Sequence, residues 1–228
     1  MRAMILAAGR GERMRPLTDT CPKPLLVAGG KSLIERHIER LAAAGFSDIV
    51  INTAWLGHLI EQALGSGTRW GVTLHYSHEG TALETAGGIA HALPLLGDAP
   101  FLLINGDVHT DWDPAQARAI AQRLDARQSD MWLMLVENPA HHPQGDFSID
   151  PQGRLQVGGP HALTYAGVAV YRPDLFAPLP PDRAQPLRPV LHQCMAQGRA
   201  IGDFYEGAWA DIGTVQRLAD LDAELSRR

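Results

Sequence analysis

Cysteine is scarce in this chain: Cys21 and Cys194 are the only two among 228 residues. Their wide separation matches neither the short spacings of metal-binding cysteines nor the framework of a disulfide-stabilised domain. Proteins that fold in a reducing compartment commonly have so few cysteines. The composition therefore favours a cytoplasmic protein.

Long apolar runs and an excess of positive charge are also missing. No stretch approaches the roughly 20 apolar residues that a membrane-spanning helix requires. The first apolar run already begins at Met4, so we expect no signal peptide. The formal net charge is -5 and 45% of the residues are hydrophobic. We therefore expect a globular protein with a sizeable core. We expect it to bind neither nucleic acid nor a membrane, and to be a monomer or a dimer.

Apolar runs of strand length alternate with segments of helical periodicity as far as residue 137. This alternation predicts an α/β fold, with a Rossmann-like, mostly parallel central sheet flanked by helices. After Asn138 the chain changes to shorter strands bounded by Gly, Pro and Asp, which indicates a small β insertion on the sheet. We expect a single domain, residues 1–228, with a first half at 1–137 and a second half at 138–228. The expected strands are 4–7, 48–52, 72–77, 101–105, 131–136, 145–149, 154–157, 163–171, 200–204 and 207–210, and the expected helices are 33–45, 56–64, 85–93, 114–127, 187–197 and 215–226.

The stretch from Met4 to Pro24 combines a strand, a glycine loop and several cations. Gly9 and Gly11 follow the apolar run, and glycine lets main-chain N–H groups approach an anion closely. Arg13, Arg15 and Lys23 supply the positive charge that a polyphosphate needs. We expect a triphosphate-binding loop at the carboxyl end of the first strand, kept extended and irregular by its prolines.

Two other glycine motifs are excluded. A dinucleotide-binding fingerprint requires a third glycine where Met14 stands, followed at once by a helix. A P-loop ends in Gly-Lys-Ser/Thr, which is absent here. An ordinary strand-to-helix turn with surface arginines remains the simpler alternative.

Residues 6–25 read L-A-A-G-x-G-x-R-M-x-P-L-T-x-x-x-P-K-P-L, which resembles the signature of the sugar-1-phosphate nucleotidylyltransferases. The resemblance implies a GT-A-like nucleotidyltransferase fold, an NTP and a sugar 1-phosphate as substrates, and release of pyrophosphate with Mg²⁺. Within the family, segments 51–57, 83–85, 105–107 and 145–147 resemble enzymes that use UTP and N-acetylmuramic acid α-1-phosphate in peptidoglycan recycling. Transfer of a guanylyl group to mannose 1-phosphate, transfer of a thymidylyl or uridylyl group to glucose 1-phosphate, and a non-catalytic NTP- or sugar-nucleotide-sensing subunit are the alternatives.

The resemblance also implies roles for individual residues. Arg13 and Lys23 would contact phosphate, and Asp107 and Asp211 would share the metal ion, with Arg13, Lys23 and Asp107 as the catalytic set. A turn or helix cap is the simpler role for either aspartate, as is a solvated surface position for Lys23. The nucleotide-binding residues would be Ala8, Gly9, Gly11, Glu12, Arg13, Lys23, Glu79, Gly80, Thr85 and Gly88, and the sugar-binding residues Asn105, Gly145, Asp146 and Tyr165.

The wall of the base pocket is expected between residues 79 and 88. Glu79 and the main chain at Gly80 are candidates for reading a pyrimidine edge, and Thr85 and Gly88 would shape the wall. Glu84 stands where many relatives have glycine. This departure argues against a simple transfer of the guanylyl or thymidylyl assignment to this chain.

Overall fold

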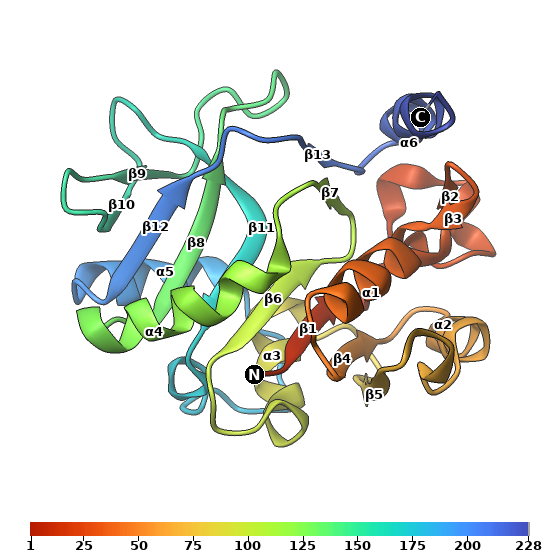
Figure 1. Cartoon of the computed structure of the whole chain (residues 1–228), viewed down its shortest axis with the longest axis horizontal. Helices are drawn as coiled ribbons and strands as arrows, with labels where there is room; N and C mark the ends of the chain where they lie inside the picture. Colours follow the sequence, from red (N-terminus) through yellow and green to blue (C-terminus); the bar gives the residue numbers. More distant parts are fainter. Residues whose placement is uncertain (228) are drawn as a thin grey trace.

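Seven strands form the central sheet, in the order β12-β8-β11-β6-β1-β4-β5, in the computed structural model, which describes residues 1–227 (Figure 1). Their bounds are β1 Ala3–Leu6, β4 Asp48–Thr53, β5 Thr73–His78, β6 Phe101–Asn105, β8 Met131–Val136, β11 Thr164–Tyr171 and β12 Ala200–Phe204. The pairs β6-β1, β1-β4, β4-β5 and β12-β8 are parallel, whereas β11 runs antiparallel to both of its neighbours. The predicted α/β fold with a mostly parallel sheet is confirmed.

Helices cover both faces of this sheet. They are α1 Leu33–Ala43, α2 Gly57–Leu64, α3 Glu84–Leu96, α4 Ala117–Arg127, α5 Leu187–Ala196 and α6 Val215–Leu225. Apolar side chains of α1, α2 and α4 pack on one face, and those of α3 and α5 pack on the other. Because β1, β4, β6 and β8 are buried on both faces, their sequences are continuous apolar runs and not alternating ones.

Local sequence explains where the first helix begins. The Ser32 hydroxyl accepts a hydrogen bond from the Glu35 N–H, and the Glu35 carboxylate accepts one from the Ser32 N–H. This reciprocal arrangement satisfies two N–H groups that a helix start would otherwise leave unpaired. The cap fixes the direction in which the chain returns from the glycine loop to the sheet.

The second half of the chain contributes more to the main sheet than we expected. Strands β11 and β12 complete the sheet beside β8, so only β9 (Phe147–Ile149) and β10 (Leu155–Val157) form a separate hairpin. The insertion is therefore smaller than the sequence indicated. The apolar run at 164–171 was not distinguishable from a strand of the insertion, because sequence alone does not show which strand it pairs with.

Residues 12–25 also differ from the sequence-based expectation of an extended loop. They form three short 3₁₀ turns, η1 Glu12–Met14, η2 Leu17–Asp19 and η3 Lys23–Leu25. The hairpin of β2 (Val27–Ala28) and β3 (Lys31–Ser32) follows, and α6 packs beside it (Figure 1). A small apolar cluster that includes Met14, Ile212 and Leu221 joins these segments. It fastens the C-terminal helix against the glycine-loop region.

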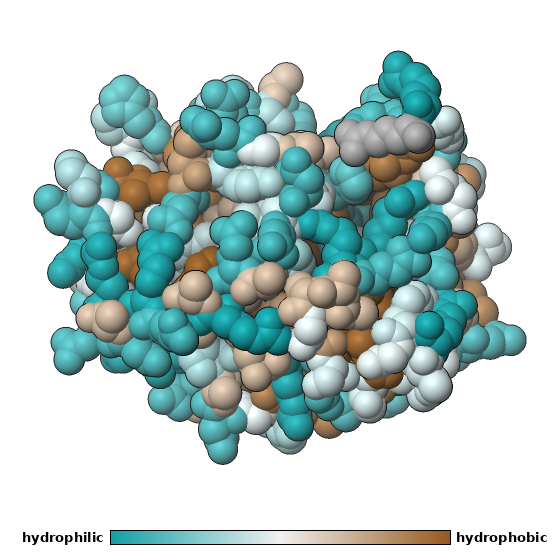
Figure 2. Space-filling view, in the orientation of Figure 1, coloured by the Kyte–Doolittle hydropathy of each residue, from teal (hydrophilic) through white to brown (hydrophobic). Residues whose placement is uncertain are grey.

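The face of the molecule drawn in Figure 2 has no large apolar patch. Figure 2 shows hydrophilic residues over most of this face, with apolar residues in small separate patches. The large hydrophobic side chains that are exposed lie on different elements: Leu17, Val27, Val157, Phe204 and Val215. Within residues 1–227, none of the helices has the length and apolar composition needed to cross a membrane.

Candidate active site

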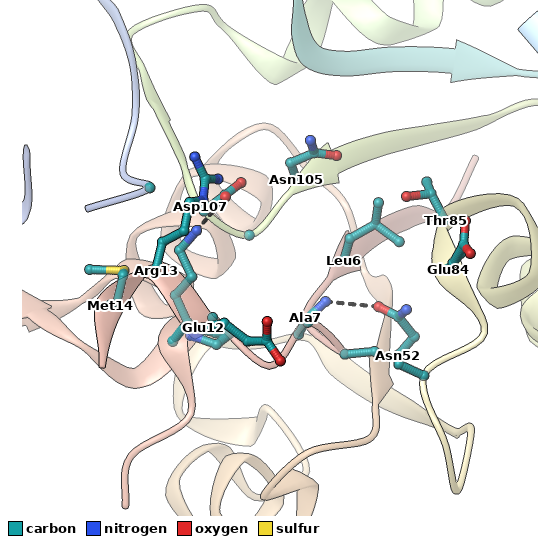
Figure 3. Close-up of a pocket in the computed structure, with 18 of the residues that line it drawn as sticks. Leu6, Ala7, Glu12, Arg13, Met14, Asn52, Glu84, Thr85, Asn105 and Asp107 are labelled. Atoms are coloured by element: carbon teal, nitrogen blue, oxygen red, sulfur yellow. Dashed lines mark hydrogen bonds and ion pairs between the residues drawn. The ribbon is translucent and has the colours of Figure 1, made fainter. Parts of the chain in front are cut away.

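Three neighbouring parallel strands end at the same edge of the sheet and open a cavity there. In the register of the sheet, Leu6 at the end of β1 pairs with Asn52 of β4 on one side and Asn105 of β6 on the other. A cavity of about 440 Å³ lies beyond these ends (Figure 3). Open α/β sheets place ligands at this edge.

The glycine loop forms one wall of this large cavity. Gly11 has φ +67, and a Cβ there would lie 3.0 Å from Thr18 Cγ2 and 3.2 Å from Lys23 Cβ. The Thr18 hydroxyl donates to the Gly11 carbonyl at 2.8 Å, which holds the loop folded back on the segment that follows. Gly9 also lines the cavity, and a Cβ at Gly9 would meet nothing within 4 Å. The two glycines therefore differ: Gly11 is needed for the fold of the loop, and Gly9 leaves the cavity open.

Lys23 and Asp107 meet inside the cavity. Lys23 Nζ lies 2.5 Å from Asp107 Oδ2, and the two side chains are 12% and 31% exposed. Lys23 begins the 3₁₀ turn η3, and Asp107 follows β6 after Gly106. The simpler sequence-based alternative for Lys23, a solvated surface lysine, does not describe this position.

Gly106 explains how the chain can turn at this point. A Cβ at Gly106 would lie 2.5 Å from the Leu6 carbonyl oxygen, which accepts the Gly106 N–H at 3.0 Å. Only glycine allows so close a contact between the ends of β6 and β1. The turn delivers Asp107 to the cavity beside the glycine loop.

A short strand pair that the sequence did not reveal brings Asp211 beside Asp107. Strand β7 (Val108–Thr110) pairs antiparallel with β13 (Trp209–Asp211), and Asp211 stands opposite Val108. The Ile212 N–H donates to the Asp107 carbonyl at 2.7 Å. A strand of three residues is too short to show a strand period in the sequence, so the pairing of β7 with β13 is visible only in the structure.

Asp211 is held by its own neighbours, and Thr214 takes the capping role that had been its simpler alternative. The Thr214 side chain accepts the Arg217 N–H at the start of α6. Asp211 Oδ1 accepts a hydrogen bond from Arg217 and lies 3.1 Å from His141 Nε2. A Cβ at Gly213 would lie 3.2 Å from the other carboxylate oxygen, Asp211 Oδ2, and 3.1 Å from Arg13 Nη2. Gly213 thus leaves room for Arg13 beside Asp211.

The donor set suits a hard divalent cation. Asp107 and Asp211 both line a second cavity, of about 270 Å³, that adjoins the large one through Asn105 and Asp107. Within residues 1–227, no group of three or more His, Cys, Asp or Glu side chains is arranged to hold a metal ion. Mg²⁺ is usually held by one or two carboxylates and completes its shell with water and phosphate oxygens. Two carboxylates beside an open cavity fit that pattern.

The residues expected at the base pocket divide into two groups. Glu79 and Thr85 line the large cavity, as do Ala8, Gly9, Gly11, Glu12, Arg13 and Lys23. Gly80, with φ +68, and Gly88, on α3, do not line it. Gly88 instead packs on Glu79, because a Cβ there would lie 2.5 Å from Glu79 Oε1.

Asn52 was missed by the sequence analysis. Asn52 is 3% exposed and lines the large cavity, and both the oxygen and the nitrogen of its side-chain amide form hydrogen bonds. Asn52 Oδ1 accepts the Ala7 N–H at 2.8 Å, and Nδ2 donates to Glu79 Oε1 at 2.6 Å. The available signal was a polar residue near the end of an apolar strand, which Asn52 shares with Asn105.

The second cavity gathers some of the residues expected to contact a sugar. Asn105 and Tyr165 line it together with His141, His142 and Trp209. The Tyr165 hydroxyl, however, faces the Tyr171 hydroxyl at 3.4 Å in the core, where burial raises its pKa. Tyr165 therefore offers this cavity mainly its main chain.

Gly145 and Asp146 support the loop beside the second cavity and do not line it. A Cβ at Gly145, where φ is +63, would lie 2.6 Å from the Ala162 carbonyl oxygen. Asp146 Oδ2 accepts the Tyr165 N–H at 3.0 Å, and its Oδ1 lies 3.2 Å from His142 Nε2. Both residues hold the 138–146 loop against β11.

The mostly parallel sheet carries a glycine loop, two cations and two carboxylates at its carboxyl edge, an arrangement that suits a phosphorylated ligand. Residues 2–228 match the family described as Nucleotidyl transferase. The chain belongs to this family.

Curated relatives match the chain over nearly its whole length. It is 54% identical to the N-acetylmuramate alpha-1-phosphate uridylyltransferase of Neisseria meningitidis serogroup B, over 98% of this chain and 97% of the relative. It is 36% identical to the protein of the same name from Caulobacter vibrioides, over 98% and 96%. Among solved structures, a putative glucose-1-phosphate thymidylyltransferase from Bacillus anthracis has a TM-score of 0.85 at 20% identity, covering 100% of this chain and 96% of that one. This last likeness confirms the fold.

Proposed function

We propose that this chain transfers the uridylyl group of UTP to N-acetylmuramic acid α-1-phosphate, giving UDP-N-acetylmuramic acid and pyrophosphate. The observation that carries the proposal is the meeting of Lys23 and Asp107 beside the glycine loop, in a chain 54% identical to a relative of that name. UTP and sugar phosphates are intracellular metabolites, so we place the reaction in the cytoplasm, in peptidoglycan recycling.

The chemistry needs positioning and charge neutralisation more than proton transfer. An oxygen of the sugar phosphate forms a bond to the α-phosphorus of UTP. The bond from that phosphorus to the oxygen bridging to the β-phosphorus breaks, and its electron pair leaves with pyrophosphate. A phosphate monoester is already largely an anion near neutral pH, so no general base is required. Alignment of the two reactants supplies a large part of the rate.

The glycine loop and the cations would hold the triphosphate. The N–H groups near Ala8, Gly9 and Gly11 would bind the phosphates, with Arg13 at the β- and γ-phosphates and Glu12 at the rim. Lys23 can turn from Asp107 to an α-phosphate oxygen within the same cavity. These contacts neutralise the charge that builds up on departing pyrophosphate.

Asp107 and Asp211 would hold Mg²⁺, which supplies positive charge at the phosphates when it is bound. Asp211 is already fixed by Arg217, and Asp107 by Lys23, so both carboxylates are oriented before any ligand arrives. The second cavity would hold the sugar. Asn105 would bind a hydroxyl group, and Gly145, Asp146 and Tyr165 would shape the cavity through the loop and the main chain.

A pyrophosphate-release assay with a panel of substrates tests the proposal. UTP, dTTP, GTP and ATP are each combined with N-acetylmuramic acid, N-acetylglucosamine, glucose and mannose 1-phosphates. We expect UTP with N-acetylmuramic acid 1-phosphate to give the highest kcat/KM, by at least about tenfold, which corresponds to roughly 1.4 kcal/mol. A higher value for GTP with mannose 1-phosphate would contradict the proposal, as would nucleotide binding without any pyrophosphate release.

Glu84 provides a test that separates function from stability. Its φ is +57, a left-handed conformation that costs an L-residue roughly 1–2 kcal/mol, and it lines the large cavity. Glu84→Gly should raise the free energy of unfolding by about 1 kcal/mol in urea denaturation. It should also raise the KM for UTP, if the strained side chain is kept for nucleotide binding.

Gln128→Gly is the matched control. Gln128 has φ +50 at the end of α4 and does not line the cavity. The Gln128→Gly variant should gain a similar free energy of unfolding, and its kcat and its KM for each substrate should stay unchanged. Unchanged kinetics in Glu84→Gly would show that Glu84 has no part in nucleotide binding.

A further inference from the structure

A buried carboxylate lies beside the large cavity with both oxygens already bonded. Glu79 follows β5 and is 9% exposed. Its Oε1 accepts from Asn52 Nδ2 at 2.6 Å, and its Oε2 accepts from the Leu83 N–H at 2.8 Å. Burial of a carboxylate is costly unless hydrogen bonds compensate for the lost water, and here two N–H donors do so.

The orientation of the Asn52 amide follows from its two partners. The Ala7 N–H is a donor, so it requires the amide oxygen, and the Glu79 carboxylate is an acceptor, so it requires the amide NH₂. The result is a chain of hydrogen bonds from Ala7 through Asn52 and Glu79 to Leu83. This chain connects the start of the glycine loop to the loop at residues 79–83.

Helix α3 closes over the same pair. A Cβ at Gly88 would lie 2.5 Å from Glu79 Oε1 and 3.0 Å from Asn52 Nδ2. The helix therefore packs directly on the pair at Gly88. Figure 3 shows the hydrogen bond from Ala7 to Asn52 as a dashed line between two of the residues that line the cavity.

We propose that Glu79 is a positioning residue: through Asn52 it holds the 79–83 loop at a fixed distance from the glycine loop. Glu79 and Ala82 of this loop line the large cavity, and main-chain groups there read the nucleobase. This inference rests on the proposed function. It revises the expectation that the Glu79 side chain itself reads a pyrimidine edge. A carboxylate would also be poorly suited to that task, since uracil presents two carbonyl acceptors beside its single N–H donor.

Exchanging the two side-chain types tests this directly. Glu79→Gln leaves an amide NH₂ facing either the Asn52 NH₂ or the Leu83 N–H. Asn52→Asp places two carboxylates 2.6 Å apart. In the double variant Asn52→Asp/Glu79→Gln, the carboxylate at position 52 accepts from Ala7 and from the new amide, whose oxygen accepts from Leu83. Every hydrogen bond returns while the charge moves to the neighbouring residue.

The Kd of UTP is measured by titration calorimetry, together with the KM of each substrate, well below each variant's Tm. We expect each single variant to weaken UTP binding by about tenfold or more, and the KM of the sugar 1-phosphate to stay within about twofold. The double variant should return to within about threefold of the original Kd. Leu124→Ala removes a buried side chain on α4 outside the cavity and controls for lost stability. We expect this variant to have a lower Tm and an unchanged Kd for UTP.

Two results would overturn the inference. One is an unchanged Kd in Glu79→Gln. The other is a double variant that regains its Tm but not its affinity, which would mean that the charge at position 79 touches the nucleotide. The proposed function fails separately, through the substrate panel: if the unaltered protein prefers another nucleotide, the same Kd comparison is made with that nucleotide.

Discussion

Asp107→Asn will lower kcat for pyrophosphate release by about a thousandfold or more, while the protein stays folded. The substitution keeps the size of the side chain and removes the charge that a divalent cation requires. Loss of a single electrostatic contact to the reacting groups costs about a hundredfold to a thousandfold in comparable sites, and a metal ligand belongs at the upper end of that range. Asp211→Asn should lower kcat by about a hundredfold, because Asp107 would still hold the ion. Steady-state kinetics across a Mg²⁺ titration measure both effects.

Asp111→Asn is the matched control for both variants. Asp111 lies four residues after Asp107, is exposed, and accepts the Tyr205 hydroxyl at 2.5 Å outside the large cavity. It should retain kcat within about twofold, as surface substitutions away from a site usually do. If the Asp107→Asn and Asp211→Asn variants both had the kcat of the control at limiting Mg²⁺, the carboxylates would have no role in catalysis.

Lys23→Ala should lower kcat/KM by about a hundredfold to a thousandfold. The side chain is 12% exposed and enters the cavity from the turn η3, where its ammonium group reaches Asp107. Arg13 lines the same cavity from the turn η1, and we expect it to stay at the β- and γ-phosphates and not to replace Lys23 at the α-phosphate. Removal also leaves Asp107 without its partner, and the apparent affinity for Mg²⁺ should rise because the competing ammonium is gone. Lys23→Arg should recover only part of the activity, since a planar guanidinium does not occupy the place of a compact ammonium.

The chain offers a matched control, since Lys31 is its one other lysine. Lys31 lies on β3, is half exposed, and pairs with Glu39 at 2.8 Å. Lys31→Ala should keep kcat/KM within about twofold, because exposed ion pairs contribute little. If Lys23→Ala and Lys31→Ala lowered kcat/KM equally, Lys23 would have no specific role in catalysis.

The sequence predicted the sheet, the glycine loop and the edge at which the cavity opens. Apolar runs such as 101–105 are long enough to be recognised, and parallel strands place their carboxyl ends together at one edge of the sheet. The roles of Asn105 and Asp107 at that edge came from the family resemblance. The capping box at Ser32 and Glu35 is likewise a local pattern, and it stands at the start of α1. These features depend on residues that are neighbours in the chain.

Features that depend on distant pairing were not predicted. The strand β7 is three residues long, and its partner β13 lies about a hundred residues later, so no local period reveals the pair that sets Asp211 beside Asp107. The Asn52–Glu79 bond is similar, since it joins the ends of two strands through side chains alone. The family resemblance pointed to Asp211 and Glu79, but it did not show what holds them.

The central claim is that Asp107 and Asp211 hold one ion against the phosphates of a nucleotide in the large cavity. Anomalous diffraction at the manganese edge tests it, from crystals grown with Mn²⁺ and a UTP analogue that cannot be cleaved at the α-phosphorus. We expect a manganese peak at roughly 2.0–2.3 Å from a carboxylate oxygen of each aspartate and from an α-phosphate oxygen. Manganese bound to the phosphates alone, with both carboxylates beyond reach, would contradict the claim.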